Sequence, residues 1–598
     1  MQSRTAAIVS AAALGVATLG TAALGAAALA PSAVAAPART TTVQVPERLC
    51  PRPAPGHVTC AGIRLATKKV SLARAAEMRR LGLAAPATEP DLTSGPAGGY
   101  TPAQLAKAYG VNRFAATSQT VAIVDVFNAP TLRQDTNTFD KRYGLPAETS
   151  TSLKIVNQSG GTNLPKPDAG WAGETSLDVQ AVRAMCAKCK ILVVLGWSDA
   201  TSNLNKAVIY AAKHASIVTN SYGMPESDGI TSADRAAYNH PGVAILASTG
   251  DDGWGAWDWF NLEDDPDGTP EFPSTANTVV AVGGTTLDLN PDGTRASERV
   301  WNSDGPNDDA GYAEAQTYGG VAGAAGSGCS TVINAQPWQR AVAGYPSLGC
   351  GSGRSGVDIA ADADPYTGFD VCDSYEVDGS CWDRTGGTSL ASPLVAGMWA
   401  VAGGPAHVSY PALTLYGHFN AGASRPFVDI TSGGTGACDA TAPTACARSF
   451  GSLTYTGSDG DDYRLDCAFS LSGKVLASRY QCRAKPGYDG VSGVGAPKGT
   501  RVFKAVLPTA VLEVNGPVAR ATSHKFSAGK SRSAFPGGTI TKYVWTWGDG
   551  TSTTTKKPNA WHKYAAAGSY SVKLVVTGTY SAQNYHRTGA QTAKITVK

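Results

Sequence analysis

The chain has little net charge and, after its first residues, no long apolar run. Its 598 residues carry 50 Lys and Arg against 47 Asp and Glu, a formal charge of +3. This near-neutral balance lacks the excess of basic residues that nucleic-acid binding requires, so no nucleic-acid partner is expected. No later run approaches the ~20 apolar residues that crossing a bilayer requires, so no membrane partner is expected.

Residues 1–36 have the pattern of a secretory signal. Arg4 supplies the positive charge, an Ala/Leu/Val/Gly stretch follows, and Ala33-Val34-Ala35 is a small-residue cleavage site. An N-terminal membrane anchor is the alternative, but Gly and Thr dilute the stretch and the A-x-A pattern favours cleavage. The sequence therefore predicts a secreted, extracellular protein.

A zinc site of paired motifs is also missing. Cys186-Ala187-Lys188-Cys189 has no second CxxC or HxxxH partner, which favours a local disulfide over zinc. The twelve cysteines fall in close successive pairs, and an even count in an exported chain indicates disulfides. The successive pairs are Cys50/Cys60, Cys186/Cys189, Cys329/Cys350, Cys372/Cys381, Cys438/Cys446 and Cys467/Cys482.

A chain of this length is expected to fold as two or more domains. Residues 37–98 are rich in Pro, Ala and basic residues and end in a linker. Over residues 99–500, short apolar runs alternate with amphipathic segments, which predicts an α/β fold with a parallel sheet covered on both faces. Expected strands are 120–126, 190–196, 216–219, 243–248 and 278–282, and expected helices are 173–185, 202–214 and 389–402.

The last part of the chain, residues 507–598, loses the helical pattern. Residues 543–547 and 570–576 alternate between apolar and polar side chains and are flanked by Gly turns, which predicts a small all-β sandwich. The Trp-x-Trp-Gly-Asp-Gly-Thr segment that begins at Trp545, with His562-x-Tyr564 and Gly568-x-Tyr570, resembles a PKD domain. An extracellular protein or polysaccharide is its expected partner.

The most informative stretch is residues 386–393, Gly-Gly-Thr-Ser-Leu-Ala-Ser-Pro. A nucleophilic serine needs an exposed Oγ at the start of a buried helix, where small neighbours admit a substrate backbone and the helix N-terminus favours negative charge. The segment around Ser389 resembles the nucleophile segment of subtilisin-type peptidases. A Gly/Ser loop that caps an ordinary helix is the alternative, which Ala391 and Pro393 disfavour.

The histidine that subtilisins require is missing. Asp125 ends an apolar strand where their aspartate is expected, but only His214 and His240 lie between Asp125 and Ser389. Neither begins an HGTHVAG-like helix, and both are interpreted as structural. A subtilisin-like enzyme with an unrecognised histidine is kept as a second hypothesis.

A different base is present. Glu174 and Asp178 lie four residues apart, which on a helix places both carboxylates on one face, where they share and relay a proton. An isolated pair of this kind is usually solvated, but Gly-Glu-x-x-Leu-Asp before an apolar strand resembles the sedolisins, the serine-carboxyl peptidases. Further segments similar to that family follow in order at residues 248–253, 272–273, 282–285, 300–302 and 358–365.

This resemblance implies a subtilisin-like parallel sheet flanked by helices. It also implies that Ser389 is the nucleophile, that Glu174 is the general base oriented by Asp178, and that Asp251 replaces the oxyanion-hole asparagine. Because only a protonated acid can donate a hydrogen bond to an oxyanion, activity is expected at low pH. The expected protein is a monomeric endopeptidase that cleaves protein or peptide substrates through an acyl-enzyme. The alternative is a non-catalytic extracellular binding protein that uses its PKD domain.

The family also binds calcium near its C-terminal end, through two aspartates and backbone carbonyls. The matching positions are Asp429, Ile430, Lys485, Gly487 and Asp489, and oxygen-only ligation suits Ca²⁺. About fifty residues separate the two halves of this set, more than is expected. Sedolisins also carry a long folded propeptide, whereas only residues 37–98 are present here as a short propeptide-like region.

Overall fold

The structure is a computed structural model of the chain. It describes residues 40–51, 54, 56–80, 85–86, 95–226, 229–256, 269–302, 323–377, 379–405, 408–420, 425–435, 454–456, 462–464, 479–535, 537–580 and 585–598. The predicted signal at 1–36 lies outside these residues. No helix within them is long and apolar enough to span a membrane.

A twisted sheet forms the centre of the α/β part of the chain. Among the described residues its strand order is β14-β13-β10-β8-β5-β7-β6, with β18 also paired to β13. Neighbouring strands run parallel, except that β14 runs antiparallel to β13. The strands are β5 Thr120–Val126, β6 Leu153–Asn157, β7 Lys190–Gly196, β8 Ile217–Asn220, β10 Ala244–Ser248, β13 Val280–Leu289, β14 Arg295–Val300 and β18 Ile359–Asp362.

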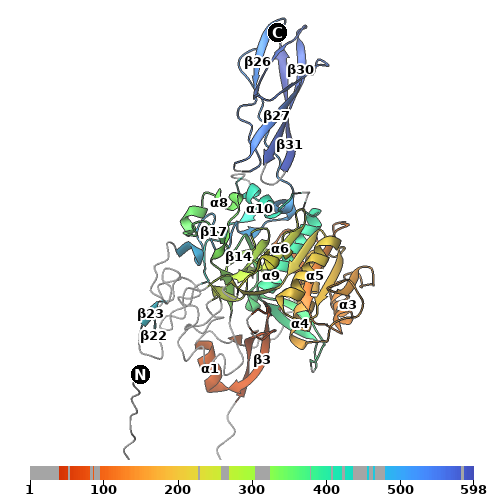
Figure 1. The fold of residues 1–598 in the computed structure, drawn as a ribbon, viewed down its shortest axis with the longest axis vertical. Helices are drawn as coiled ribbons and strands as arrows, with labels where there is room; N and C mark the ends of the chain where they lie inside the picture. Colours follow the sequence, from red (N-terminus) through yellow and green to blue (C-terminus); the bar gives the residue numbers. More distant parts are fainter. Residues whose placement is uncertain are drawn as a thin grey trace, which may run out of the picture.

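Helices cover both faces of this sheet (Figure 1). In β5, Val121 and Ile123 pack with α4 and α9, whereas Ala122 and Val124 pack with α5 on the other face. Burial on both faces explains why the strand reads as a continuous apolar run. The helices are α2 Pro102–Ala108, α3 Leu132–Tyr143, α4 Ala169–Met185, α5 Thr201–His214, α6 Ser232–Ala237, α8 Pro337–Arg340, α9 Thr388–Ala402 and α10 Ala412–Phe419.

The five strands and three helices expected from the sequence are all present. The helix predicted to begin at 173 begins at Ala169, because the Asp168 side chain caps it by accepting a hydrogen bond from the Trp171 N–H at 3.1 Å. Short strands surround the core: β9 Tyr222–Pro225, β11 Asp252–Trp254, β12 Glu271–Phe272, β15 Ala324–Ser327, β16 Cys329–Asn334, β17 Gly353–Ser355, β21 Phe427–Val428, β24 Ala496–Pro497.

The N-terminal region is paired into the α/β part. Strand β1 (Thr40–Arg48) runs antiparallel to β3 (Ile63–Ser71), and β3 pairs with β20 (Trp382–Gly386), which precedes α9. The same sheet is completed by β19 (Phe369–Cys372) and β4 (Ala85–Pro86), and α1 (Leu72–Arg80) follows β3. Between β1 and β3, the two-residue strand β2 (Thr59–Cys60) pairs with β9.

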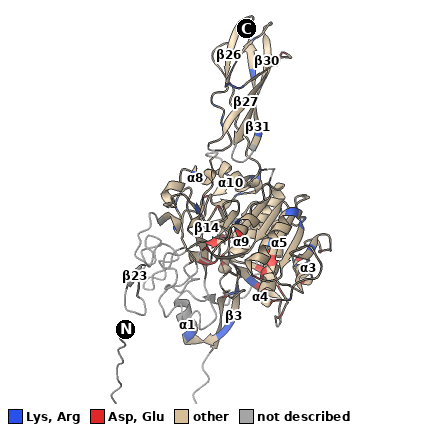
Figure 2. Cartoon of the chain, viewed as in Figure 1, with Lys and Arg blue, Asp and Glu red and all other residues tan. Residues whose placement is uncertain are grey.

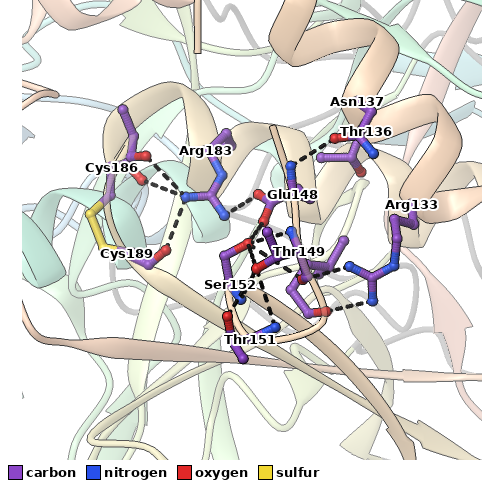
Figure 3. A network of polar contacts seen from close by, with 12 residues as sticks. Arg133, Thr136, Asn137, Glu148, Thr149, Thr151, Ser152, Arg183, Cys186 and Cys189 are labelled. Carbon is purple, nitrogen blue, oxygen red and sulfur yellow. Dashed lines mark hydrogen bonds and ion pairs between the residues drawn. A yellow bond between two sulfur atoms is a disulfide. The ribbon is translucent and has the colours of Figure 1, made fainter. Parts of the chain in front are cut away.

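The C-terminal end of α4 is fixed by a buried ion pair (Figure 3). Arg183 pairs with Glu148, and its Nη1 donates to the carbonyls of Cys186, at 3.4 Å, and Cys189, at 2.9 Å. The Cys186–Cys189 disulfide closes the turn that presents these carbonyls. Separating this buried ion pair would leave an uncompensated charge, which is strongly destabilising. The contact therefore restrains the end of the helix that carries Glu174 and Asp178.

Four of the predicted disulfides are present among the described residues. They are Cys50–Cys60, Cys186–Cys189, Cys329–Cys350 and Cys372–Cys381. The other two predicted pairs involve Cys438, Cys446 and Cys467, which lie outside the described residues.

The last strands form a separate C-terminal β-domain, defined here as β25–β31. Trp545, Trp547 and Tyr564 are fully buried in its core, and the two indoles stack at 5.5 Å. Phe535 and Tyr580 instead belong to the apolar core of the α/β part, together with residues of α10, at the junction seen in Figure 1. The strands are β25 Glu513–Val514, β26 Ser523–Ser527, β27 Thr539–Thr546, β28 Ser552–Thr555, β29 Asn559–Lys563, β30 Gly568–Tyr580 and β31 Tyr585–Val597.

Candidate active site

Ser389 lies in the first turn of α9, directly after β20. Gly387 joins the two elements with a φ of 91°, a conformation that favours glycine. A Cβ at Gly387 would also lie 2.3 Å from the Ala61 carbonyl oxygen and 2.5 Å from Asp251 Oδ2. The Ser389 side chain is buried, and its Oγ donates to the Ser221 carbonyl at 3.3 Å. Glycine therefore lets the chain turn sharply while two oxygens approach beside the serine.

Glu174 and Asp178 lie on one face of α4, which packs against α9. Both side chains are fully buried, and acidic residues lie within the body of the domain beside these helices (Figure 2). Ser221 donates its hydroxyl to Asp178 Oδ1 at 2.7 Å. Neither Glu174 oxygen meets hydrogen-bond geometry among the described residues, although the Ser389 hydroxyl lies close enough to lower the glutamate pKa. The structure thus brings together the three residues predicted to act in proton transfer.

A third carboxyl, Asp125 at the end of β5, joins this pair. Burial raises the pKa of Asp125 to about 7, against a hydrogen bond from Thr175. Burial raises the pKa of both Glu174 and Asp178 well above the usual range, and the charge of Asp125 raises each further. Carboxyls this close do not ionise independently, so the cluster retains protons at mildly acid pH and shares the first negative charge. The sequence placed Asp125 at a strand end but did not identify it as part of this cluster.

Asp251 follows β10 and faces the same serine. Its Oδ1 accepts hydrogen bonds from the Thr388 N–H at 2.7 Å and the Thr388 hydroxyl at 2.8 Å, while Oδ2 is buried without a partner among the described residues. Burial raises the pKa of Asp251 to about 7, and the Thr388 hydrogen bonds and the charge of Arg48 oppose the rise. A neutral Asp251 therefore has a free donor position at Oδ2 beside the Ser389 N–H.

A further acidic pair lies behind Asp251. Glu271, on β12, is buried, and its pKa is raised well above normal by burial and by the charges of Asp252 and Asp251. Arg48, at the end of β1, forms an ion pair with Asp252. Sequence reasoning noted the adjacent Phe272-Pro273 but missed Glu271, because a lone glutamate before an apolar pair is an ordinary surface pattern.

The histidines between Asp125 and Ser389 are engaged elsewhere. His214 stacks on Tyr210 with ring centroids 4.0 Å apart, and its Nδ1 lies 2.7 Å from the Tyr210 carbonyl. His240 Nε2 lies 3.0 Å from the Ala237 carbonyl. These local contacts support the carboxyl cluster, rather than a histidine, as the source of the base.

The five residues predicted to bind calcium lie in one group of loops. Pairing of β21 with β24 joins the two halves, and Asp429 Oδ2 accepts from the Gly487 N–H at 2.9 Å. Asp489 is buried and accepts from the Lys485 N–H at 2.9 Å, and burial raises its pKa to about 7. The two carboxylates are ligands that suit Ca²⁺, although the backbone groups bonded to them here are N–H donors. Among the described residues no group of three or more His, Cys, Asp or Glu side chains is arranged to hold a metal ion, so carbonyls would have to complete the ligand set.

The fold and the serine–carboxyl arrangement are similar to those of subtilisin-like peptidases, and the comparisons agree. The subtilase family matches residues 156–412, and the PKD domain matches residues 505–597. The predicted resemblance to the sedolisins, with a C-terminal PKD domain, is confirmed by the curated proteins to which this chain is similar. Kumamolisin of Bacillus sp. (strain MN-32) is 29% identical over 69% of this chain and 64% of its own length. Sedolisin of Pseudomonas sp. (strain 101) is 25% identical over 62% of this chain and 60% of its own length.

A solved structure supports the predicted fold class. Pseudomonas sedolisin, described as a serine-carboxyl proteinase complexed with two molecules of pseudo-iodotyrostatin, superposes with a TM-score of 0.50 at 23% identity. It covers 68% of this chain and 97% of that structure. The subtilisin-like sheet with helices, followed by all-β PKD strands, is therefore confirmed. The chain spans less than two thirds of the length of the two curated relatives above, at 64% and 60%.

Proposed function

We propose that this protein is a secreted, monomeric serine-carboxyl endopeptidase that hydrolyses protein or peptide substrates at acid pH. The observation that supports this most directly is the convergence of Ser389, Glu174 and Asp251, from three separate elements, in one buried site. The histidines between Asp125 and Ser389 are engaged elsewhere, so a histidine-dependent mechanism has no support from the geometry.

The arrangement supplies the parts of acyl transfer. Ser389 Oγ attacks the substrate carbonyl carbon while Glu174 takes the proton of the serine hydroxyl. Asp178 stabilises the negative charge that the carboxyl cluster shares. The Ser389 N–H and a protonated Asp251 donate to the oxyanion that forms. The proton then passes to the leaving amine, and a water molecule hydrolyses the ester.

Hydrolysis of a denatured protein, measured from pH 2 to pH 9 with the wild type and with Ser389→Ala, tests this function. Acid-side activity that Ser389→Ala abolishes is the expected result. An activity optimum above about pH 8, with activity that rises around pH 6.5, where histidine titrates, would instead favour the hypothesis of a subtilisin-like enzyme with a histidine base.

The other two components of the protein have supporting roles in this proposal. Ca²⁺ held by Asp429, Asp489 and the carbonyls of Ile430, Lys485 and Gly487 stabilises the folded peptidase domain. The PKD domain binds an extracellular protein or polysaccharide, and Trp561 on β29, 63% exposed, offers an aromatic surface for such contact.

A further inference from the structure

A buried carboxyl that the proposed mechanism does not use lies beside the serine site. Glu271, on β12, is 2% exposed, and its Oε1 has no hydrogen-bond partner among the described residues. Burying a polar atom without a partner is unfavourable, so a native structure that retains such an atom calls for an explanation. A ligand that reaches Oε1 during the reaction would supply the partner.

Two glycines make room for the Glu271 carboxyl. A Cβ at Gly223, on β9, would lie 2.0 Å from Oε2, and a Cβ at Gly250 would lie 1.8 Å from Oε1. Strand β9 lies between β12 and β2, and Gly250 directly precedes Asp251. The carboxyl therefore occupies the space of two missing side chains, next to the residue proposed to stabilise the oxyanion.

The backbone at Ala61 marks where a residue of a bound peptide lies. The Ala61 N–H donates to the Ser221 carbonyl at 3.2 Å, and the Ala61 carbonyl accepts from the Ser389 N–H at 3.0 Å. This carbonyl oxygen and Asp251 Oδ2 both lie within 2.5 Å of the position that a Cβ on Gly387 would occupy. Because backbone pairing does not depend on side chains, the substrate residue whose carbonyl Ser389 attacks takes this position, beside Asp251.

Arg48 supplies a positive charge to the same group of carboxyls. It forms an ion pair with Asp252, in which 11% of the Arg48 side chain and 2% of the Asp252 side chain are exposed. Burial raises the pKa of Asp251 and of Glu271, and the charge of Arg48 opposes the rise in each. Arg48 belongs to β1, so a substrate that displaces the N-terminal segment from the site also removes this charge. The three buried carboxyls then lack a cation, which favours a ligand that brings one.

We propose that Asp252 and Glu271 form a subsite for a basic side chain, so that the peptidase cleaves after Lys and Arg in preference to other residues. This inference rests on the proposed function and adds the class of substrate. The ammonium or guanidinium of the substrate replaces that of Arg48 and donates charge-assisted hydrogen bonds to Asp252 and to Glu271 Oε1. The residue that carries this cation is the one whose carbonyl Ser389 attacks, because the subsite adjoins the oxyanion donor Asp251.

The first measurement uses the full-length wild-type protein and three quenched fluorescent peptides at pH 5. The peptides are identical except at the residue before the cleaved bond, which is Lys, Arg or norleucine, and mass spectrometry verifies the position of the cut. Norleucine has the straight chain of Lys without its ammonium group, so the comparison isolates the charge. Since a hydrogen bond to a charged group changes a binding constant by about 10–100-fold, kcat/KM should be higher by this factor for the Lys and Arg peptides.

The second measurement repeats the series with Glu271→Gln, Asp252→Asn and Asp288→Asn. The first two variants should bring the ratio of kcat/KM between the Lys and norleucine peptides close to one. Asp288→Asn is the matched control and should keep the wild-type ratio, because Asp288 pairs with Arg299 and 42% of its side chain is exposed. Circular dichroism checks the fold of each variant, and if either Glu271→Gln or Asp252→Asn does not fold, the other decides.

The outcomes separate the subsite from the proposed function. Equal kcat/KM for the Lys and norleucine peptides in the wild type overturns the subsite and leaves the peptidase function standing, and an Arg48–Asp252 ion pair that serves only the fold gives this result. A preference for Lys that both Glu271→Gln and Asp252→Asn retain also overturns it. If neither the peptides nor denatured protein are hydrolysed at any pH, the proposed function fails and the subsite fails with it.

Discussion

Asp125 and Asp251 in the α/β part and Asp549 in the C-terminal β-domain lie in opposite environments. In the α/β part, Asp125 and Asp251 are buried, and burial raises the pKa of each to about 7. In the C-terminal β-domain, Asp549 lies at a turn, where hydrogen bonds from Thr551 and His562 lower its pKa. The first arrangement keeps Asp125 and Asp251 protonated at acid pH, whereas the second favours the ionised form of Asp549, which holds the turn through its hydrogen bonds. Acid therefore affects the stability contributions of these two kinds of group with opposite sign.

The largest expected difference between the two parts is in catalysis. Glu174→Ala should lower kcat on denatured protein by about 10⁴-fold or more, because residues that act as a unit fail together. Glu513→Ala removes a surface carboxylate that pairs with Lys530 in the C-terminal β-domain, and it should leave kcat unchanged. Circular dichroism of both variants checks the fold. Near-normal turnover by Glu174→Ala with an intact fold would disprove the carboxyl-base mechanism.

The next effect is on the pH profile. Wild-type activity should fall with an apparent pKa near 7, as Asp251 loses the proton it donates. Removing one oxyanion donor costs about 10²–10³-fold in kcat, and Asp251→Asn keeps a donor at every pH. The residual activity of Asp251→Asn should therefore decline less on the alkaline side. An alkaline limb that is the same in both proteins would assign it to another group.

A smaller effect concerns stability. Asp125 has a folded-state pKa raised above that of the unfolded chain, so its contribution is full below about pH 4 and is lost as pH rises to about 7. Such shifts are worth on the order of a few kcal/mol. Calorimetry at pH 4 and pH 7 should show a lower Tm at pH 7, and Asp125→Asn should reduce that difference.

Asp549→Asn is the matched control for this measurement. The lowered pKa of Asp549 stabilises the fold above the unfolded-state pKa, and this contribution is lost only as pH falls below it. The variant should leave the difference between pH 4 and pH 7 intact. If it reduces the difference as Asp125→Asn does, the contrast between the two parts is wrong.

Calcium should have the smallest effect. A cation that binds only the folded state stabilises it by about 2.7 kcal/mol at a hundredfold excess over Kd. EDTA should therefore lower the wild-type Tm, and Asp489→Ala should abolish the difference between Ca²⁺ and EDTA. An unchanged wild-type Tm in EDTA would show that the predicted ligands do not hold the ion.

Much of the α/β core could be predicted because buried strands and helices have recognisable patterns of apolar residues in the sequence. The continuous apolar run of β5 and the capped start of α2, where Thr101 accepts from the Gln104 N–H, are local patterns. Ser389, Glu174 and Asp251 could be named because the segments around them resemble motifs of the sedolisins. Their mutual approach then followed from the expected fold.

The path of the N-terminal segment could not be predicted for the opposite reason. Strand β2 has two residues, and it is held by backbone pairing with β9, which leaves no side-chain pattern. Gly62 matters because Glu174, 112 positions away in sequence, fills the space beside it. Asp125 and Glu271 were missed as parts of acidic clusters for the same reason, since their partners come from other elements.

The contact of Phe535 with α10 has a mechanical consequence. A Cβ on Gly417 of α10 would lie 2.4 Å from the Phe535 ring, so the two parts meet by close packing there. A domain carried on a loose tether samples every direction within its reach, whereas a packed joint transmits orientation. Anchoring the outer end of the β-domain would therefore set the direction in which the Ser389 site faces and its height above the support.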